Sequence, residues 1–223
     1  MQNLDKLCRK LGYSFKRPEL LEQALTHRSF GSRNNERIEF LGDAILGYLI
    51  SIELYRRFPQ ASEGELSRLR ASLVKGETLA SIATELDLGD YLNLGSGELK
   101  SGGHRRRSIL ADAFEAIIGA VYLDSGIDNA SALVEAFFKE RIAELDPRTL
   151  KKDPKTRLQE YLQARGNELP EYQVVATEGK AHEQRFKVEC TIGSLADKVT
   201  GEGTSRRKAE QAAAEKMLQA LTD

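Results

Sequence analysis

Two pairs of acidic residues lie inside stretches that otherwise have the composition of buried helices. Glu39 and Asp43 are four residues apart, and Asp112 and Glu115 are three apart. These spacings place both acids of a pair on one face of a helix, beside or inside a core. Burying an unpaired carboxylate is costly unless the group takes up a proton or meets a cation. We therefore expect two helices to bring four carboxylates to one divalent cation.

Oxygen ligands alone favour the hard ions Mg²⁺ and Mn²⁺. Zinc sites and di-iron bundles use histidine, but none of the three histidines, His27, His104 and His182, follows a candidate glutamate by three residues. His27 is more typical of a local hydrogen bond than of a metal ligand. Acid pairs at helical spacing are also common on solvated surfaces, and the apolar flanks favour the metal interpretation. Either one ion or two would fit.

The elements that must position these acids are helical. Apolar residues recur at helical spacing through residues 1–148, and proline or glycine separates the segments. We predict an all-α domain with helices over residues 18–26, 36–58, 63–86, 108–123 and 129–145, and a glycine-rich loop over residues 95–103.

A second, smaller domain is predicted over residues 154–223. Residues 149–153 are polar and lie between two prolines, which is typical of a linker, either a flexible hinge or a docked strap. After it, apolar residues first recur at helical spacing, then alternate with polar residues as in strands, and finally return to helical spacing. We predict an α+β domain of order α-β-β-β-α, with helices over 155–165 and 205–221 and strands over 172–176, 186–192 and 195–199.

Composition and charge are those of an ordinary folded protein. The chain has 223 residues, of which 40% are hydrophobic and 30% charged, and this length predicts two domains. A net charge of −1 and a pI of about 6.4 argue against nucleic-acid binding unless basic side chains are clustered. Clusters do occur, at residues 105–107 and 206–208.

The sequence shows no sign of a membrane protein. Its longest apolar stretch, residues 44–52, is too short to cross a bilayer, and the N-terminus lacks the basic and apolar regions of a signal peptide. The two cysteines, Cys8 and Cys190, fall in different predicted domains, which suits a reducing compartment. We expect a cytoplasmic protein.

Residues 35–43, Asn-Glu-Arg-Ile-Glu-Phe-Leu-Gly-Asp, resemble the signature of ribonuclease III, the bacterial double-stranded-RNA endonuclease. Residues 24–29, 65–70, 97–103 and 109–116 match further motifs in the family's order, and the C-terminal part resembles a double-stranded-RNA-binding domain. The resemblance covers essentially the whole chain. It implies a homodimeric, Mg²⁺-dependent endoribonuclease in which a water activated by the metal cuts duplex RNA. It also implies 5′-phosphate and 3′-hydroxyl ends, a short 3′ overhang, and ribosomal, messenger and transfer RNA precursors as substrates.

Position by position, the resemblance implies that the metal is held by Glu39, Asp43, Asp112 and Glu115, of which Asp43 and Glu115 are catalytic. Glu36 and Glu65 would be accessory acids. Phe40 corresponds to the aromatic that packs into the partner subunit of the homodimer, although an ordinary core phenylalanine fits the sequence equally well.

In the C-terminal domain the resemblance implies two minor-groove contacts and one set of phosphate contacts. Thr156, Gln159 and Glu160 would meet one minor groove, His182 the next, and Arg206, Arg207 and Lys208 the intervening phosphates. Arg105, Arg106 and Arg107 either follow RNA near the acidic site or form a solvated loop.

Two other functions are alternatives to an endoribonuclease that cuts duplex RNA. A non-catalytic protein that binds double-stranded RNA is disfavoured because all four acids are present. A metal-dependent phosphohydrolase acting on nucleotides is disfavoured by the RNA-binding order of elements and by the lack of paired histidine and aspartate ligands.

Overall fold

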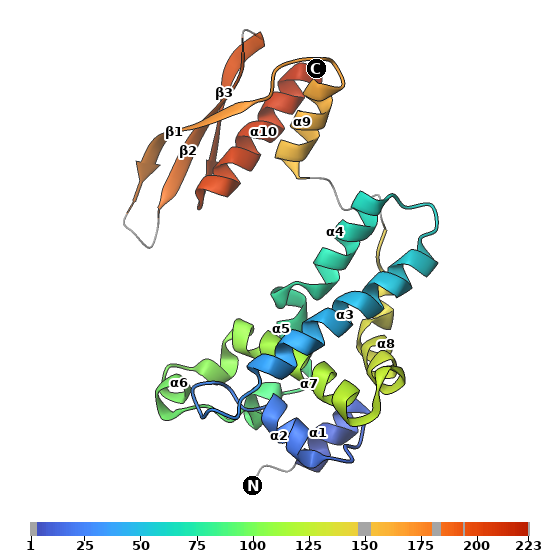
Figure 1. Ribbon diagram of the computed structural model, residues 1–223. Helices are drawn as coiled ribbons and strands as arrows, with labels where there is room; N and C mark the ends of the chain where they lie inside the picture. The colour runs from blue at the N-terminus through green and yellow to red at the C-terminus, as the bar shows by residue number, and fades with distance from the viewer. Residues whose placement is uncertain (1–3, 147–152, 180–183, 194, 223) are drawn as a thin grey trace. The chain divides into compact units, whose positions relative to one another are not determined.

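The chain folds into two compact units, Met1–Leu150 and Lys151–Asp223, which are described separately. The computed structural model describes residues 4–146, 153–179, 184–193 and 195–222 (Figure 1). Regular elements of the first unit are helices, and the second unit combines three strands with two helices. Both predicted fold classes are confirmed. The limits of the domains at residues 148 and 154 stay predictions.

The described helices of the first unit differ from the predicted ones in several places. In chain order they are α1 (Leu4–Leu11), α2 (Pro18–Ala24), α3 (Glu36–Arg57), α4 (Glu63–Val74), α5 (Gly76–Glu85), η1 (Leu88–Tyr91), α6 (Ser96–Lys100), η2 (Gly103–Arg105), α7 (Arg107–Ser125) and α8 (Ile127–Ala143). The first helix, α1, was not predicted, and the expected loop over residues 95–103 contains α6. The single helix expected over residues 63–86 is wrong, because Lys75 has an extended backbone that separates α4 from α5. This turn lets α5 pack its apolar side on α7.

Helix α7 forms the centre of the first unit. Most of its residues are buried and they lie on all of its sides, which is the pattern of a helix enclosed by others. Helices α2, α3, α5 and α8 all contact it (Figure 1). Among the described helices, none combines the length and the apolar character that crossing a bilayer requires.

Glycines allow α3 and α7 to approach until their backbones touch. A Cβ atom on Gly42 would lie 1.8 Å from the carbonyl oxygen of Glu115, and one on Gly119 would lie 2.4 Å from that of Ile38. Real Cβ atoms cannot approach so closely, so larger residues would push the helices apart. This crossing therefore fixes the distance between the turns that carry Glu39 and Glu115.

The second unit has the predicted α-β-β-β-α order. Its elements are α9 (Pro154–Gln163), β1 (Glu171–Glu178), β2 (Arg185–Ile192), β3 (Leu195–Gly203) and α10 (Arg206–Thr222), and the strands form an antiparallel sheet of order β1-β2-β3. Strand β3 is longer than predicted because Gly201 and Gly203 pair with β2. A Cβ on Gly201 would lie 2.1 Å from the backbone nitrogen of Ala213, so glycine lets α10 lie directly on this strand.

Candidate metal centre

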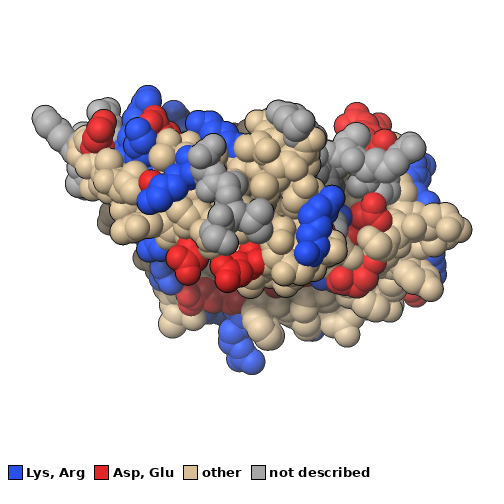
Figure 2. Space-filling view, turned by 90° about the horizontal axis from the view of Figure 1, so that it is seen from above, with Lys and Arg blue, Asp and Glu red and all other residues tan. Residues whose placement is uncertain are grey.

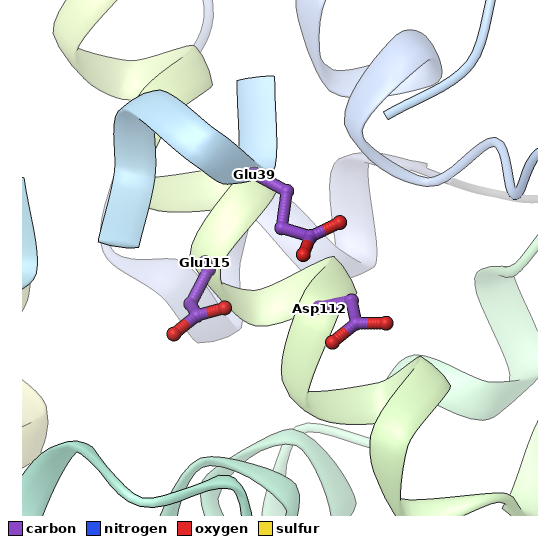
Figure 3. Close-up of side chains that lie close together, drawn as sticks. All are labelled: Glu39, Asp112 and Glu115. Atoms are coloured by element: carbon purple, nitrogen blue, oxygen red, sulfur yellow. The ribbon is translucent and has the colours of Figure 1, made fainter. Parts of the chain in front are cut away.

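Glu39 of α3 and Asp112 and Glu115 of α7 direct their carboxylates into one space (Figure 3). One oxygen from each lies within 4.8 Å of the others, and all three residues are partly buried. Within the part of the chain that the structure describes, none of these carboxylates has a hydrogen-bond or ion-pair partner. Oxygen ligands of one Mg²⁺ lie roughly 3–4 Å apart, because each is about 2.1 Å from the ion. Small side-chain rotations would place all three on one ion.

Burial and mutual repulsion disfavour the ionised forms of these acids. Burial, followed by the charges of Asp43, Glu39 and Asp112, raises the pKa of Glu115 from 4.5 to about 8. Burial also raises the pKa of Glu39, with Asp112 as the strongest charged neighbour, and raises the pKa of Asp112. A hard cation would remove both costs, so the donor set fits the metal that the sequence predicted.

Asp43 lies at the edge of this group. Its side chain is exposed, and it does not belong to the three residues whose oxygens converge. The expectation that Asp43 shares a buried face with Glu39 is wrong, because α3 buries the side that carries Ile38 and Gly42. Asp43 is nevertheless the strongest charged neighbour of Glu115. The structure thus brings three of the four predicted ligands together and leaves the fourth within electrostatic reach.

The two accessory acids have different surroundings. Glu36 lines the same cavity as Glu39 and Asp112 and forms an ion pair with Arg28 at 3.4 Å. Glu65 instead accepts hydrogen bonds from the backbone nitrogen and the hydroxyl of Ser62, both at 2.7 Å, in a capping box that starts α4. The Ser-x-x-Glu spacing is a sequence signal for this cap that the motif-based interpretation overlooked.

The three consecutive arginines around the start of α7 take three different partners. Arg106 lines the cavity beside Glu39 and Asp112 and pairs with Glu98 at 2.8 Å. The Nε atom of Arg105 donates to His104, and Arg107 donates to the backbone carbonyl of Glu77. Of the triplet, only Arg106 therefore faces the acidic site.

The basic residues predicted to bind phosphates are exposed at the start of α10. Arg206 pairs with Glu210 at 2.9 Å, Arg207 lies 4.0 Å from Asp153, and Lys208 donates to the hydroxyl of Thr204. Across the whole chain, Figure 2 shows both basic and acidic side chains on the face in view. Arg206 and Arg207 thus each lie beside an internal acid, whereas Lys208 meets a hydroxyl.

The predicted minor-groove residues are placed in part. Thr156, Gln159 and Glu160 are exposed and lie within one turn of α9, so they share a side of that helix. His182 lies outside the described residues.

Comparison with known families matches both units. The family described as Ribonuclease-III-like matches residues 17–142, and the double-stranded RNA binding motif matches residues 154–221. The chain belongs to the ribonuclease III family. As a member of that family it is a metal-dependent endoribonuclease acting on double-stranded RNA.

Relatives agree over almost the full length. Ribonuclease 3 of Shewanella frigidimarina is 61% identical over 221 residues, and that of Vibrio cholerae is 58% identical over 220 residues; each alignment covers 99% of this chain and 98% of the relative. The nuclease domain of ribonuclease III from Campylobacter jejuni has 44% identity and a TM-score of 0.62, covering 66% of this chain and 100% of that one. A second structure of that domain, with the same identity and TM-score over 63% of this chain and 99% of that one, concerns flexibility in a region involved in dimer formation.

Within the ribonuclease III signature, the sequence interpretation missed what its glycine does. Gly42 and Gly119 bring the two acidic helices into backbone contact, and an isolated glycine inside each helical pattern is the signal that could have shown this. The alternative that Phe40 is an ordinary core residue is wrong, because its side chain is 78% exposed.

Proposed function

We propose that Glu39, Asp112 and Glu115, with Asp43 at their edge, hold Mg²⁺ and form the cleavage site for double-stranded RNA. The observation that carries this proposal is the group of three partly buried carboxylates that have no hydrogen-bond or ion-pair partner among the described residues. An ion bound there would lower the pKa of water and offset negative charge on the phosphate. Mn²⁺ satisfies the same oxygen donors.

The chain's own residues would position both partners of the reaction. Asp43 and Glu115 stand at the exposed and the buried side of the site, where Asp43 is open to solvent and Glu115 is held against α3. Attack of water on phosphorus with loss of the 3′ oxygen leaves a 5′-phosphate and a 3′-hydroxyl. No side chain has to act as a covalent nucleophile.

A second copy of the chain would complete the cutting of both strands. Phe40, Tyr48 and Tyr55 are 78%, 57% and 74% exposed and lie along one side of α3. We propose that this aromatic side packs against the partner subunit, with Phe40 inserted into it. A twofold dimer would place one site at each strand and leave a short 3′ overhang. Glu65 would serve the site as an accessory acid only within such a dimer, since in one chain it caps α4.

The C-terminal unit would hold the duplex by shape. Arg206, Arg207 and Lys208 are exposed beside the start of α10, where the helix N-terminus also favours phosphate. Thr156, Gln159 and Glu160 would meet a minor groove, and His182 is proposed for the next groove from the sequence alone. We further propose precursors of ribosomal, messenger and transfer RNA as substrates and, because Cys8 and Cys190 are free thiols, a cytoplasmic location.

The test compares perfect duplex RNA, single-stranded RNA and nucleotides in Mg²⁺ and then in a chelator. We expect only the duplex to be cut, and only with the metal. Glu115→Gln should keep duplex binding and dimer formation but lower the single-turnover rate by about 100-fold or more. Exposed Glu135 on α8 provides the matched control, since Glu135→Gln should cut at the normal rate. Normal cutting by the Glu115 variant in saturating Mg²⁺ would overturn the ligand assignment.

A further inference from the structure

The backbone around His27 is held firmly beside the acidic site. The residue follows α2 and lines the same cavity as Glu39 and Asp112. Its backbone nitrogen donates to the carbonyl of Asn93 at 3.0 Å, and the nitrogen of Asn93 donates to the carbonyl of Leu25 at 2.9 Å. These two backbone hydrogen bonds join distant parts of the chain and fix the position of the His27 backbone, from which the imidazole extends.

The ring of His27 is fixed as well, through one of its nitrogens. The backbone nitrogen of Ser29 donates to Nδ1 at 3.2 Å, so Nδ1 is an acceptor. The hydroxyl of Ser29 lies 2.8 Å from the same atom and itself accepts from the backbone nitrogen of Gly95 at 3.0 Å, which leaves its own hydrogen for Nδ1. In the neutral ring the proton must then be on Nε2.

The Nε2–H group has no partner in the part of the chain that the structure describes, and solvent reaches it. The two arginines of this cavity are engaged: Arg28 pairs with Glu36 and Arg106 pairs with Glu98. His27 lies near Asp112, since a protonated ring at this place would lower the pKa of that acid, as Arg28 does. Nε2–H is therefore a donor in this cavity that no acid of the described residues occupies.

We propose that His27 Nε2–H donates a hydrogen bond to a non-bridging oxygen of the phosphate that is cut, which makes His27 a further catalytic residue. The inference rests on the proposed metal centre, because that centre places the phosphate beside Glu39 and Asp112. Carboxylates that are ionised around a metal only accept hydrogen bonds, so they offer nothing to phosphate oxygens. A neutral donor in the same cavity supplies what they lack and stabilises charge that grows during the reaction.

Two substitutions separate this role from a purely structural one. The amide of glutamine can occupy the place of Nε2, whereas the amide of asparagine can occupy the place of Nδ1 and keep the bonds to Ser29. We expect His27→Asn and His27→Ala to lower the single-turnover rate in Mg²⁺ by about 10- to 100-fold, as loss of a hydrogen bond to a charged group does. His27→Gln should recover most of the rate. Duplex binding in Ca²⁺ should stay within a few-fold for all three.

The opposite pattern overturns the proposal. If His27→Asn is restored and His27→Gln is not, the ring only holds the loop in place. Unchanged cutting by His27→Ala, or failure of both amides in variants that melt normally, equally refutes a donor at Nε2. Cutting by the unaltered protein tests the metal centre itself, so failure there is distinct from failure among the variants.

A measurement on the unaltered protein covers the case in which the variants do not fold. Diethyl pyrocarbonate modifies accessible imidazoles, and modified peptides can be counted by mass spectrometry. Duplex RNA bound in Ca²⁺ should protect His27 severalfold. Equal modification of His27 with and without RNA would overturn the proposal.

Discussion

In the helical unit three carboxylates lie together with no ion-pair partner among the described residues, whereas in the C-terminal unit two arginines at the start of α10 each face an internal acid. Glu115 illustrates the first arrangement, because burial and neighbouring acids raise its pKa to about 8. Arg206 illustrates the second, since its guanidinium is 2.9 Å from Glu210 and largely exposed. The acids of the helical unit therefore require a cation. The arginines of the C-terminal unit must give up an internal acid before they can pair with a phosphate.

This difference determines how each ligand should act. A cation entering the acidic site removes an electrostatic cost of the fold, so binding and stability should be coupled. Double-stranded RNA arriving at α10 gains contacts with arginines that already have partners, and part of its binding energy replaces the internal pairs. Metal binding should therefore change the stability of the fold. RNA affinity should change when a single acid that pairs with one of these arginines is replaced.

The largest effect is expected from Gly42→Ala, which would break the helix contact that creates the acidic site. Its Cβ would lie 1.8 Å from the carbonyl oxygen of Glu115. The helices must separate, which should lower the free energy of unfolding by about 3 kcal/mol or more. Displaced carboxylates should also lower the cleavage rate by about 100-fold. Thermal denaturation and single-turnover cleavage measure the two effects.

Gly47→Ala on the same helix is the matched control. A Cβ at Gly47 meets nothing within 4 Å, and alanine favours a helix by about 1 kcal/mol over glycine. This variant should be as stable as the unaltered protein or more so. If both variants behave alike, the close approach of α3 and α7 is not what positions the acids.

The next effect concerns stability in the absence of metal. The pKa of Glu115 is about 8 in the folded chain, raised from 4.5, so the folded state binds the extra proton between these values. In a chelator, the stability that this bound proton contributes is therefore fully present below about pH 4.5, decreases as the pH rises, and is lost once the pH has passed through about 8. Mg²⁺ at about ten times its Kd should restore about 1.4 kcal/mol at high pH. Melting temperatures across this range, with and without Mg²⁺, test the expectation.

Glu115→Gln distinguishes this source from any other. The amide carries no charge, so the decline in the chelator should become shallower and the gain from Mg²⁺ should shrink. A decline of the same slope in this variant would mean that other acids carry the pH dependence.

Sequence reasoning found the acids of the site because helical spacing is local. Glu39, Asp112 and Glu115 could be placed on their helices from the apolar residues around them. The exposure of Asp43 could not be predicted, because it depends on which side of α3 meets α7. That choice is made by the contact at Gly42 and Gly119, which joins residues far apart in the chain.

Contacts between residues far apart in the chain also explain why some predicted helix and strand bounds were wrong. The break at Lys75 follows from the packing of α5 on α7, and apolar spacing alone continues straight through it. The predicted third strand stopped at Val199, whereas β3 continues to Gly203, and a Cβ on Gly201 or Gly203 would collide with the backbone of α10. His27 was correctly assigned a local hydrogen bond, but the direction of its free nitrogen requires coordinates.

A smaller effect is expected from Arg206→Ala combined with Arg207→Ala. Loss of two phosphate contacts should weaken duplex binding by about tenfold and reduce the slope of log affinity against log salt by about 1–2. Binding isotherms at several salt concentrations measure both. Lys198→Ala is the control, since Lys198 is also exposed and paired, with Glu189 at 2.9 Å, but lies on β3. An unchanged slope in the double variant would show that these arginines do not contact phosphate.

The smallest effect should come from Glu210→Gln, and it tests the exchange of partners most directly. Glu210 pairs with both Arg206 and Lys155, at 2.9 and 2.8 Å. Removing its charge frees two cations beside the proposed phosphate-binding surface. Because solvent reaches the basic side of each pair, such pairs contribute about 1 kcal/mol or less, and duplex binding should tighten only about two- to fivefold. The same substitution in the Arg206→Ala background should gain less, since one of the two cations is gone. Weaker binding by Glu210→Gln would mean that the acid holds Arg206 in the orientation that RNA requires, and the pairs would then be part of the binding surface rather than its competitors.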